Sequence, residues 1–266
     1  SDQTGIPVDK INVVQGDSDL IATGGGTGGS RSVTTQNTAT LATATKMIEA
    51  FGAYWAEKEG FDPAEVQFDD ERFRKDGSNL APTMLELAEM ARSDERDDLM
   101  VHEARTTLDA RSYPNGAHVA EVEIDPDTGE TRVDRYTVVD DFGNLINPLL
   151  AEGQVHGGVV QGIGQALTER VVYDGDGQLL TASFMDYAMP RAADSPWIGF
   201  TSCPVPSTGN PMGMKGCGEA GTVGALAAVT NAVQDALWAQ GIKRVDMPLT
   251  PLKVWSLLNK APIAAE

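Results

Sequence analysis

The segment KGCGEAGTVGALAAVTNAVQDALW, residues 215–238, joins a glycine-rich loop to a stretch that is almost entirely apolar. The apolar stretch, Thr222 to Trp238, predicts a helix that is buried on most of its sides. Glu219 stands among small residues directly before this helix, where partial burial would suit its carboxylate to proton abstraction. A carboxylate is also common as a simple N-cap, so the segment alone leaves both roles open. Cys217 in the same loop is either a reactive thiol or a small buried residue.

A second glycine-rich segment precedes this loop in the chain. Residues 147–169 predict a helix whose interior contains Gly153, Gly157, Gly158, Gly162 and Gly164. Each interior glycine costs about 1 kcal/mol relative to alanine, so we expect another backbone or a ligand to approach this helix closely. Gln161 offers amide donors and an acceptor to a heterocycle, or simply faces solvent. Glu152 and His156 are four residues apart and can pair on one helix face.

A third glycine-rich segment, TGGGTGGSRS at residues 23–32, precedes another helix. Three- and four-residue steps between apolar residues predict that helix, through Leu41, Ala44, Ile48, Phe51 and Trp55. The glycines let backbone N–H groups converge on an anion, while Thr27, Ser30, Ser32 and Arg31 add hydroxyl donors and a cation suited to phosphate. The segment has neither the Gly-Lys-Ser/Thr of a P-loop nor the spacing of a dinucleotide-binding fingerprint. It is therefore either an anion-binding loop or a flexible surface loop.

The remaining N-terminal elements are short. Residues 10–14 predict a strand, and residues 62–78 predict a surface hairpin. A helix is expected over residues 83–92, because Thr83 and Glu86 have the spacing of a capping box.

The C-terminal half alternates strands and helices without a regular βαβ order. Residues 117–140 predict two antiparallel strands around a turn at 125–130, and residues 198–203 predict a further strand. Thr250 followed by Pro251 predicts the start of a last helix. The pattern favours an α+β fold with mixed, largely antiparallel sheets and packed helices.

The charged connector at residues 93–98 suggests a domain boundary. We expect a subdomain with the glycine tract at residues 1–98 and a second, with Glu219 and the glycine-rich helix, at residues 99–266.

Composition excludes several classes of function. The 266 residues include 20 basic and 39 acidic ones, a formal net charge of −19, which disfavours nucleic acid and anionic membrane surfaces as partners. No apolar run approaches the length of a membrane span. Two cysteines, Cys203 and Cys217, do not make a disulfide scaffold, although a bridge between them is conceivable from spacing alone. The three histidines are scattered, so side chains are not expected to ligate a metal.

Taken together, four segments resemble the xanthine dehydrogenase, aldehyde oxidase and carbon monoxide dehydrogenase family of molybdenum hydroxylases. They resemble the C-terminal part of its large, molybdopterin-binding subunit and occur in the family's order, at residues 26–32, 140–148, 153–164 and 215–225. The resemblance implies an oxidoreductase that oxidises an aldehyde, an N-heterocycle or carbon monoxide with water-derived oxygen.

The resemblance also assigns roles to individual residues. Glu219 occupies the position of the catalytic base in the family's Lys-Gly-any-Gly-Glu signature. The implied cofactor-binding residues are Gly26, Thr27, Gly28, Ser30, Arg31, Ser32, Gln161 and Gly218. The resemblance implies that a pterin dithiolene holds the metal and that the pterin carries a cytosine dinucleotide. It also implies that the cofactor lies close to the glycine-rich helix.

The implied partners follow from the same resemblance. They are the upstream half of the large subunit, an iron–sulfur subunit and an FAD subunit, assembled as a dimer of heterotrimers in the cytoplasm. The family's upstream Gly-Gln-Gly-His loop is absent, so we expect residues 1–266 alone to fold without binding molybdopterin and without hydroxylase activity. Two alternatives remain: a non-catalytic assembly module or cofactor-free split-subunit fragment, and a nucleotide-dependent dehydrogenase using the 24–32 loop.

Overall fold

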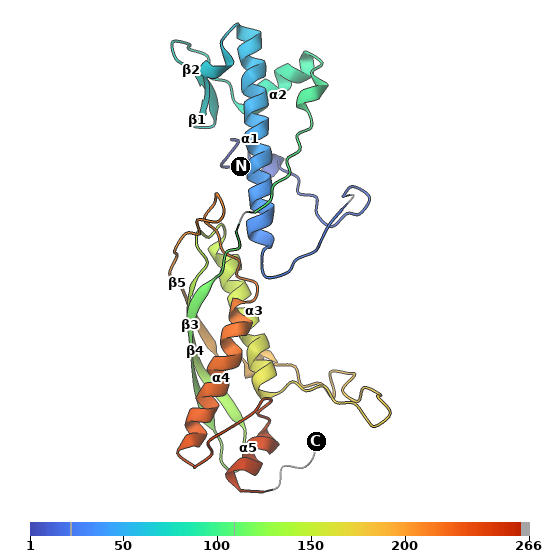
Figure 1. Ribbon diagram of the computed structural model, residues 1–266, viewed down its shortest axis with the longest axis vertical. Helices are drawn as coiled ribbons and strands as arrows, with labels where there is room; N and C mark the ends of the chain where they lie inside the picture. The colour runs from blue at the N-terminus through green and yellow to red at the C-terminus, as the bar shows by residue number, and fades with distance from the viewer. Residues whose placement is uncertain (22, 109, 262–266) are drawn as a thin grey trace. The chain divides into compact units, whose positions relative to one another are not determined.

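The computed structural model describes residues 1–21, 23–108 and 110–261. The chain divides into two compact units (Figure 1). Unit 1 comprises Ser1–Gly28 and Ser32–Ala110, and unit 2 comprises Gly29–Arg31 and Arg111–Glu266. Within the described residues, no helix combines the length and the apolar character that crossing a bilayer requires.

Unit 1 is organised around the long helix α1, Ser32–Glu59. An antiparallel hairpin of β1 (Val66–Asp69) and β2 (Arg72–Lys75), together with α2 (Met84–Ser93), packs against α1 (Figure 1). The apolar core that joins these elements contains Phe51, Tyr54, Trp55, Phe73, Met84, Leu87, Ala91 and Leu99. The structure thus confirms the predicted apolar helix face and the predicted hairpin.

The predicted capping box at the start of α2 is also confirmed. The Thr83 hydroxyl accepts the Glu86 N–H at 3.3 Å, and the Glu86 carboxylate accepts the Thr83 N–H at 2.7 Å. These bonds satisfy N–H groups that the first helical turn leaves without intrahelical partners. The rest of unit 1 includes three short 3₁₀ helices, η1 (Val8–Lys10), η2 (Pro63–Glu65) and η3 (Asp97–Leu99).

Residues 10–14 do not form the predicted strand. The segment begins in η1 and continues without regular structure, and no described strand pairs with it. Ile11, Val13 and Val14 are exposed. Branched side chains favour extended backbone, but a strand also needs a neighbour for its N–H and C=O groups, and this segment has none among the described residues.

Unit 2 contains a three-stranded sheet in the order β3–β4–β5. The strands are β3 (Asn115–Ile124), β4 (Thr131–Asp141) and β5 (Trp197–Ser202). β4 pairs antiparallel with β3, with an irregularity between Glu121 and Val122, and it pairs parallel with β5. The predicted antiparallel pair and the later strand are therefore confirmed, and the two sheets and five α-helices of the described residues make an α+β fold.

Helices α3 (Pro148–Leu167) and α4 (Ala220–Trp238) pack against each other and against this sheet, and α5 (Pro251–Leu258) is the last helix of the described residues (Figure 1). Asn147 caps α3 and Thr250 caps α5, each followed by proline at the first helical position. A 3₁₀ helix, η4, spans Ala192–Asp194. The shared core includes Tyr136, Val138, Phe142, Val155, Val159, Val229 and Val233.

Three glycines allow α3 and α4 to approach closely. A Cβ added to Gly158 would lie 2.9 Å from the Gly221 Cα atom, and one added to Gly162 would lie 2.5 Å from the Ala225 Cβ atom. A Cβ on Gly221 would lie 2.5 Å from the Val155 carbonyl oxygen. Helix–helix packing therefore accounts for Gly158 and Gly162, whereas the resemblance implied that the cofactor would.

Helix α4 is buried along one stripe only. Its buried residues recur every four positions, at Gly221, Ala225, Val229, Val233 and Leu237. Away from this stripe, Val223 is 67% exposed and Trp238 is 52% exposed. The prediction that this helix is buried on most sides is therefore wrong for the chain as described.

Candidate active site

Glu219 is the residue immediately before α4. It occupies the N-cap position, but its side chain makes no capping hydrogen bond. Instead, its Oε2 atom accepts a hydrogen bond from the Ser30 hydroxyl at 2.5 Å. The carboxylate is exposed, which differs from the expected partial burial, because the flanking small residues leave it uncovered. The structure thus argues against a simple N-cap role and leaves one carboxylate oxygen, Oε1, without a hydrogen bond from any described residue.

The glycines beside Glu219 make room for Ser30. A Cβ on Gly216 would lie 1.7 Å from the Ser30 carbonyl oxygen, and one on Gly218 would lie 3.3 Å from the Ser30 Oγ atom. Ser30 itself has a φ of 54°, in the left-handed region that non-glycine residues seldom adopt. The Gly-any-Gly spacing before Glu219 is therefore what lets a strained serine backbone sit against this loop.

A nearly buried ion pair anchors the same loop four residues before Glu219. Lys215 Nζ lies 2.5 Å from Asp141 Oδ2, and the two side chains are only 10% and 13% exposed. The Asp141 Oδ1 atom also accepts the N–H groups of Gly143 and Val205, at 2.9 and 2.8 Å. Burial alone would raise the pKa of Asp141, but the Lys215 ammonium and these two amides hold it below its ordinary value. Asp141 stays ionised and ties three chain segments together.

A second polar group lies beneath the start of α4. The His118 ring bridges Tyr136 and Asp140, with Nδ1 2.9 Å from the tyrosine oxygen and Nε2 3.3 Å from Asp140 Oδ1. The His118 and Asp140 side chains are 7% and 2% exposed, and a Cβ on Gly224 would lie 2.5 Å from the imidazole ring. Burial, together with the Asp140 carboxylate, raises the pKa of Tyr136 well above its usual range.

Cys217 lies close enough to this polar group to be affected by it. Burial raises the pKa of the Cys217 thiol, a backbone hydrogen bond opposes the rise, and the Asp140 carboxylate adds to it. A protonated thiol is a poor nucleophile. Of the two interpretations of Cys217, the small, partly buried residue is therefore favoured. Cys203 and Cys217 are both free.

Gln161 projects from the exposed side of α3 next to the first turn of α4. The Thr222 hydroxyl lies 2.9 Å from its Oε1 atom and 3.1 Å from the Gly158 carbonyl oxygen. The amide nitrogen of Gln161 has no partner among the described residues and can donate to a ligand. On the same helix, a Cβ on Gly153 or Gly157 would meet nothing within 4 Å, so this part of the helix surface is open.

The glycine tract leads directly into α1. A Cβ on Gly24, Gly25, Gly26 or Gly28 would meet nothing within 4 Å, so the space beside this backbone is open. The Thr27 and Ser32 hydroxyls form a short hydrogen bond to each other at the start of α1. The N–H groups of a first helical turn have no intrahelical acceptor, and together with clustered hydroxyls they can bind an anion such as phosphate. The tract therefore has the donors of an anion-binding loop.

The structure brings together only part of the predicted site. Within unit 2 it joins Ser30 and Gly218 to Glu219, and within unit 1 it joins Thr27 to Ser32. Sequence reasoning missed the Asp141–Lys215 pair and the buried His118 group. His118 could have been found from the sequence. It lies an even number of residues before Val122 and Ile124 in the alternating strand, so its side chain is on the same face and points to the core.

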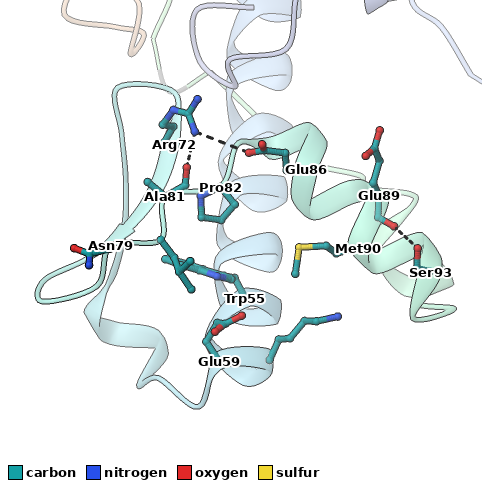
Figure 2. A pocket seen from close by; sticks show the side chains of 12 residues that line it. Trp55, Glu59, Arg72, Asn79, Ala81, Pro82, Glu86, Glu89, Met90 and Ser93 are labelled. Atoms are coloured by element: carbon teal, nitrogen blue, oxygen red, sulfur yellow. Dashed lines mark hydrogen bonds and ion pairs between the residues drawn. The ribbon is translucent and has the colours of Figure 1, made fainter.

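No group of three His, Cys, Asp or Glu side chains within the described ranges is arranged to hold a metal ion. A cavity of about 650 Å³ opens in unit 1, lined in part by Trp55, Pro82 and Met90 (Figure 2). Two of its charged side chains pair with each other, Arg72 with Glu86 at 3.9 Å. Because none of the predicted site residues lines it, we do not assign it to the site.

A family model described as molybdopterin cofactor-binding domain matches residues 1–196. The gamma subunit of the 6-hydroxypseudooxynicotine dehydrogenase complex of Paenarthrobacter nicotinovorans is 35% identical over 96% of this chain and 33% of its own length. The carbon monoxide dehydrogenase large chain of Afipia carboxidovorans is 34% identical over 96% of this chain and 32% of its own length. The chain thus spans about a third of these relatives.

Solved structures include a similar fold. A crystal structure of the Cu,Mo-CO dehydrogenase in its carbon monoxide reduced state matches with a TM-score of 0.88 and 32% identity, over 97% of this chain and 33% of that one.

Proposed function

Because this chain belongs to the molybdopterin cofactor-binding domain family, we propose that it is the cofactor-binding and base-supplying part of a molybdenum hydroxylase large subunit. The observation that carries the proposal is the state of Glu219. It lies in the Lys-Gly-any-Gly-Glu loop, its side chain does not cap α4, and its Oε1 atom is open to a ligand.

Each unit, taken by itself, offers groups that suit a phosphate-bearing pterin. In unit 1, the open glycine tract, the Thr27 and Ser32 hydroxyls and the start of α1 supply donors for an anion. In unit 2, Gln161 supplies an exposed amide next to the open surface at Gly157. We propose that Gly26, Gly28, Ser30, Arg31 and Gly218 complete the set that contacts the cofactor.

The bound molybdenum cofactor would supply two-electron redox chemistry. The work of this chain is to bind and orient that group and to manage a proton. In the proposed reaction Glu219 Oε1 accepts a proton as water-derived oxygen is transferred to the substrate. The Asp141–Lys215 pair holds the loop on which Glu219 stands, and the α3–α4 packing holds Gln161 close to the same helix start.

The wider proposal concerns the complete enzyme. We infer a small-molecule substrate that is an aldehyde, an N-heterocycle or carbon monoxide. Relatives named for 6-hydroxypseudooxynicotine and for carbon monoxide support this range. The proposal includes a cytosine dinucleotide form of the pterin, an upstream half of the subunit, partner subunits with iron–sulfur clusters and FAD, a dimer of heterotrimers and a cytoplasmic location.

The test is the Glu219→Gln variant of the complete enzyme. The amide keeps the shape of the side chain but cannot accept the proton, so turnover should fall by at least ~10²-fold while molybdenum content stays at the wild-type level. Asp235→Asn, on the exposed side of the same helix, is the matched control and should change neither quantity. Near-normal turnover of Glu219→Gln at full molybdenum content would refute the assignment.

A further inference from the structure

We propose that Ser30 is a positioning residue for Glu219, whose hydroxyl fixes one carboxylate oxygen and thereby aims the other at the reacting proton. This inference rests on the proposed function of Glu219 and adds a role that cofactor binding alone does not require. Its basis is the hydrogen bond from Ser30 Oγ to Glu219 Oε2 at 2.5 Å, between residues 189 positions apart in the chain.

The backbone of Ser30 adopts a conformation that carries an energetic cost for a residue with a side chain. Ser30 has a φ of 54°, and a glycine would adopt this conformation more easily. The facing loop carries glycine at 216 and at 218, where a side chain would meet Ser30 atoms at 1.7 and 3.3 Å. A serine in a strained conformation, accommodated by two glycines, indicates that its hydroxyl is used.

The Ser30 hydroxyl can fix the orientation of the exposed Glu219 side chain. A glutamate side chain has several rotatable bonds, and Glu219 makes no capping bond that would fix it. Donation from Ser30 to Oε2 restricts those rotations and leaves Oε1 free to accept a proton. A charge-assisted O–H···O⁻ bond of this length is among the stronger hydrogen bonds in proteins.

Two other uses of Ser30 are weaker on the geometry. If its hydroxyl only bound the cofactor, it would not need to face the carboxylate. If the residue only formed the turn before α1, the left-handed conformation would favour glycine over serine.

The experiment compares Ser30→Ala and Ser30→Gly in the complete, molybdenum-loaded enzyme. Both variants lose the hydroxyl, but only Ser30→Gly also relieves the strain of the left-handed backbone conformation. We expect both to lower kcat by about tenfold, the scale of a lost hydrogen bond to a charged group, with KM and molybdenum content within about twofold of wild type. Ser93→Ala, which removes a hydroxyl that donates to the Glu89 carbonyl in α2, is the matched control and should leave all three quantities unchanged.

Three results would overturn the proposal. Wild-type kcat in Ser30→Gly would show that the hydroxyl is not needed. A fall in molybdenum content matching the fall in rate would make Ser30 a cofactor contact only. In the Glu219→Gln background, adding Ser30→Ala should change the residual kcat by less than about twofold, and a further tenfold loss would show that Ser30 acts independently of Glu219.

The outcome for Ser30 can be separated from the outcome for the proposed function. If Glu219→Gln is slow and both Ser30 variants are fast, Glu219 remains the base and only the positioning role fails. If Glu219→Gln is itself fast at full molybdenum content, the proposed function fails first.

Discussion

Replacing Asp141 by asparagine should destabilise unit 2 by loosening the loop that carries Glu219. The substitution keeps the shape of the side chain, but it removes the charge opposite Lys215 and turns an amide toward the ammonium. The Gly143 and Val205 N–H groups keep an oxygen acceptor. The change therefore isolates the ion pair from the two backbone hydrogen bonds.

The expected magnitude follows from burial. The Lys215 and Asp141 side chains are 10% and 13% exposed, and removing one partner of a buried pair costs about 3–5 kcal/mol because the other charge stays behind. Because both side chains keep some exposure, we expect the lower end, about 3 kcal/mol of unfolding free energy. For a chain of this size that corresponds to a fall in Tm of roughly 6–12 °C.

The assay is urea unfolding followed by circular dichroism, comparing midpoints at equal slope. Asp134→Asn, on the exposed side of the same strand, should leave the midpoint essentially unchanged. Combining Asp141→Asn with Lys215→Met should recover part of the loss, since no charge is then left unpaired. A single Asp141→Asn variant within about 0.5 kcal/mol of wild type would refute the anchoring role of the pair.

The Asp141–Lys215 ion pair also predicts how stability depends on pH in the acidic range. The pKa of Asp141 lies below its ordinary value in the folded chain, so its contribution to stability is complete above the unfolded pKa of about 3.9. The contribution is lost as pH falls through the lower, folded pKa. When the pH is lowered from neutral to acidic, the unfolding free energy of the wild type should therefore fall more than that of Asp141→Asn. Equal falls in the two proteins would contradict this prediction.

Three further predictions concern other parts of the chain. Gly162→Ala should destabilise the protein by about 2 kcal/mol or more, because the new methyl group would lie 2.5 Å from Ala225 Cβ. Gly157→Ala on the same helix meets nothing within 4 Å and should stabilise the protein by up to about 1 kcal/mol. Thermal unfolding of the two variants measures both effects. Arg31→Ala in the complete subunit should lower pterin occupancy more than turnover per bound cofactor, and unchanged occupancy would remove Arg31 from the cofactor loop. Residues 1–266 expressed alone should fold cooperatively and contain no molybdenum, and purification with stoichiometric metal would contradict that expectation.

Elements that local chemistry defines were predictable from sequence. The capping box needs only Thr83 and Glu86, three residues apart, and the Thr250-Pro251 pair marks the start of α5 within a single turn. Such signals involve backbone groups close in the chain, so tertiary contacts have little opportunity to override them.

Elements that depend on distant neighbours were not predictable. Val13 and Val14 have strand-forming side chains, but the described structure provides no partner strand for them. Apolar residues dominate the sequence of α4, yet only the stripe facing α3 and β3 is covered, so Val223 and Trp238 remain exposed. Composition indicates which residues can be buried, and packing decides which of them are.

The same limit applies to the candidate site. Glu219 carries a short motif that can be recognised in the sequence, but its partner Ser30 is 189 residues away, and Lys215 is 74 residues from Asp141. No periodicity or spacing links residues that far apart. The role of Gly158 and Gly162 was likewise hidden, because a glycine in a sequence does not reveal whether a helix or a ligand approaches it.

The glycine contact between α3 and α4 has a mechanical consequence. Where Gly158 meets Gly221, backbone touches backbone, and no side chain can change rotamer to absorb a shift between the helices. The two helices should therefore move as one stiff body, with Gln161 and Glu219 keeping a nearly constant spacing as ligands enter and leave.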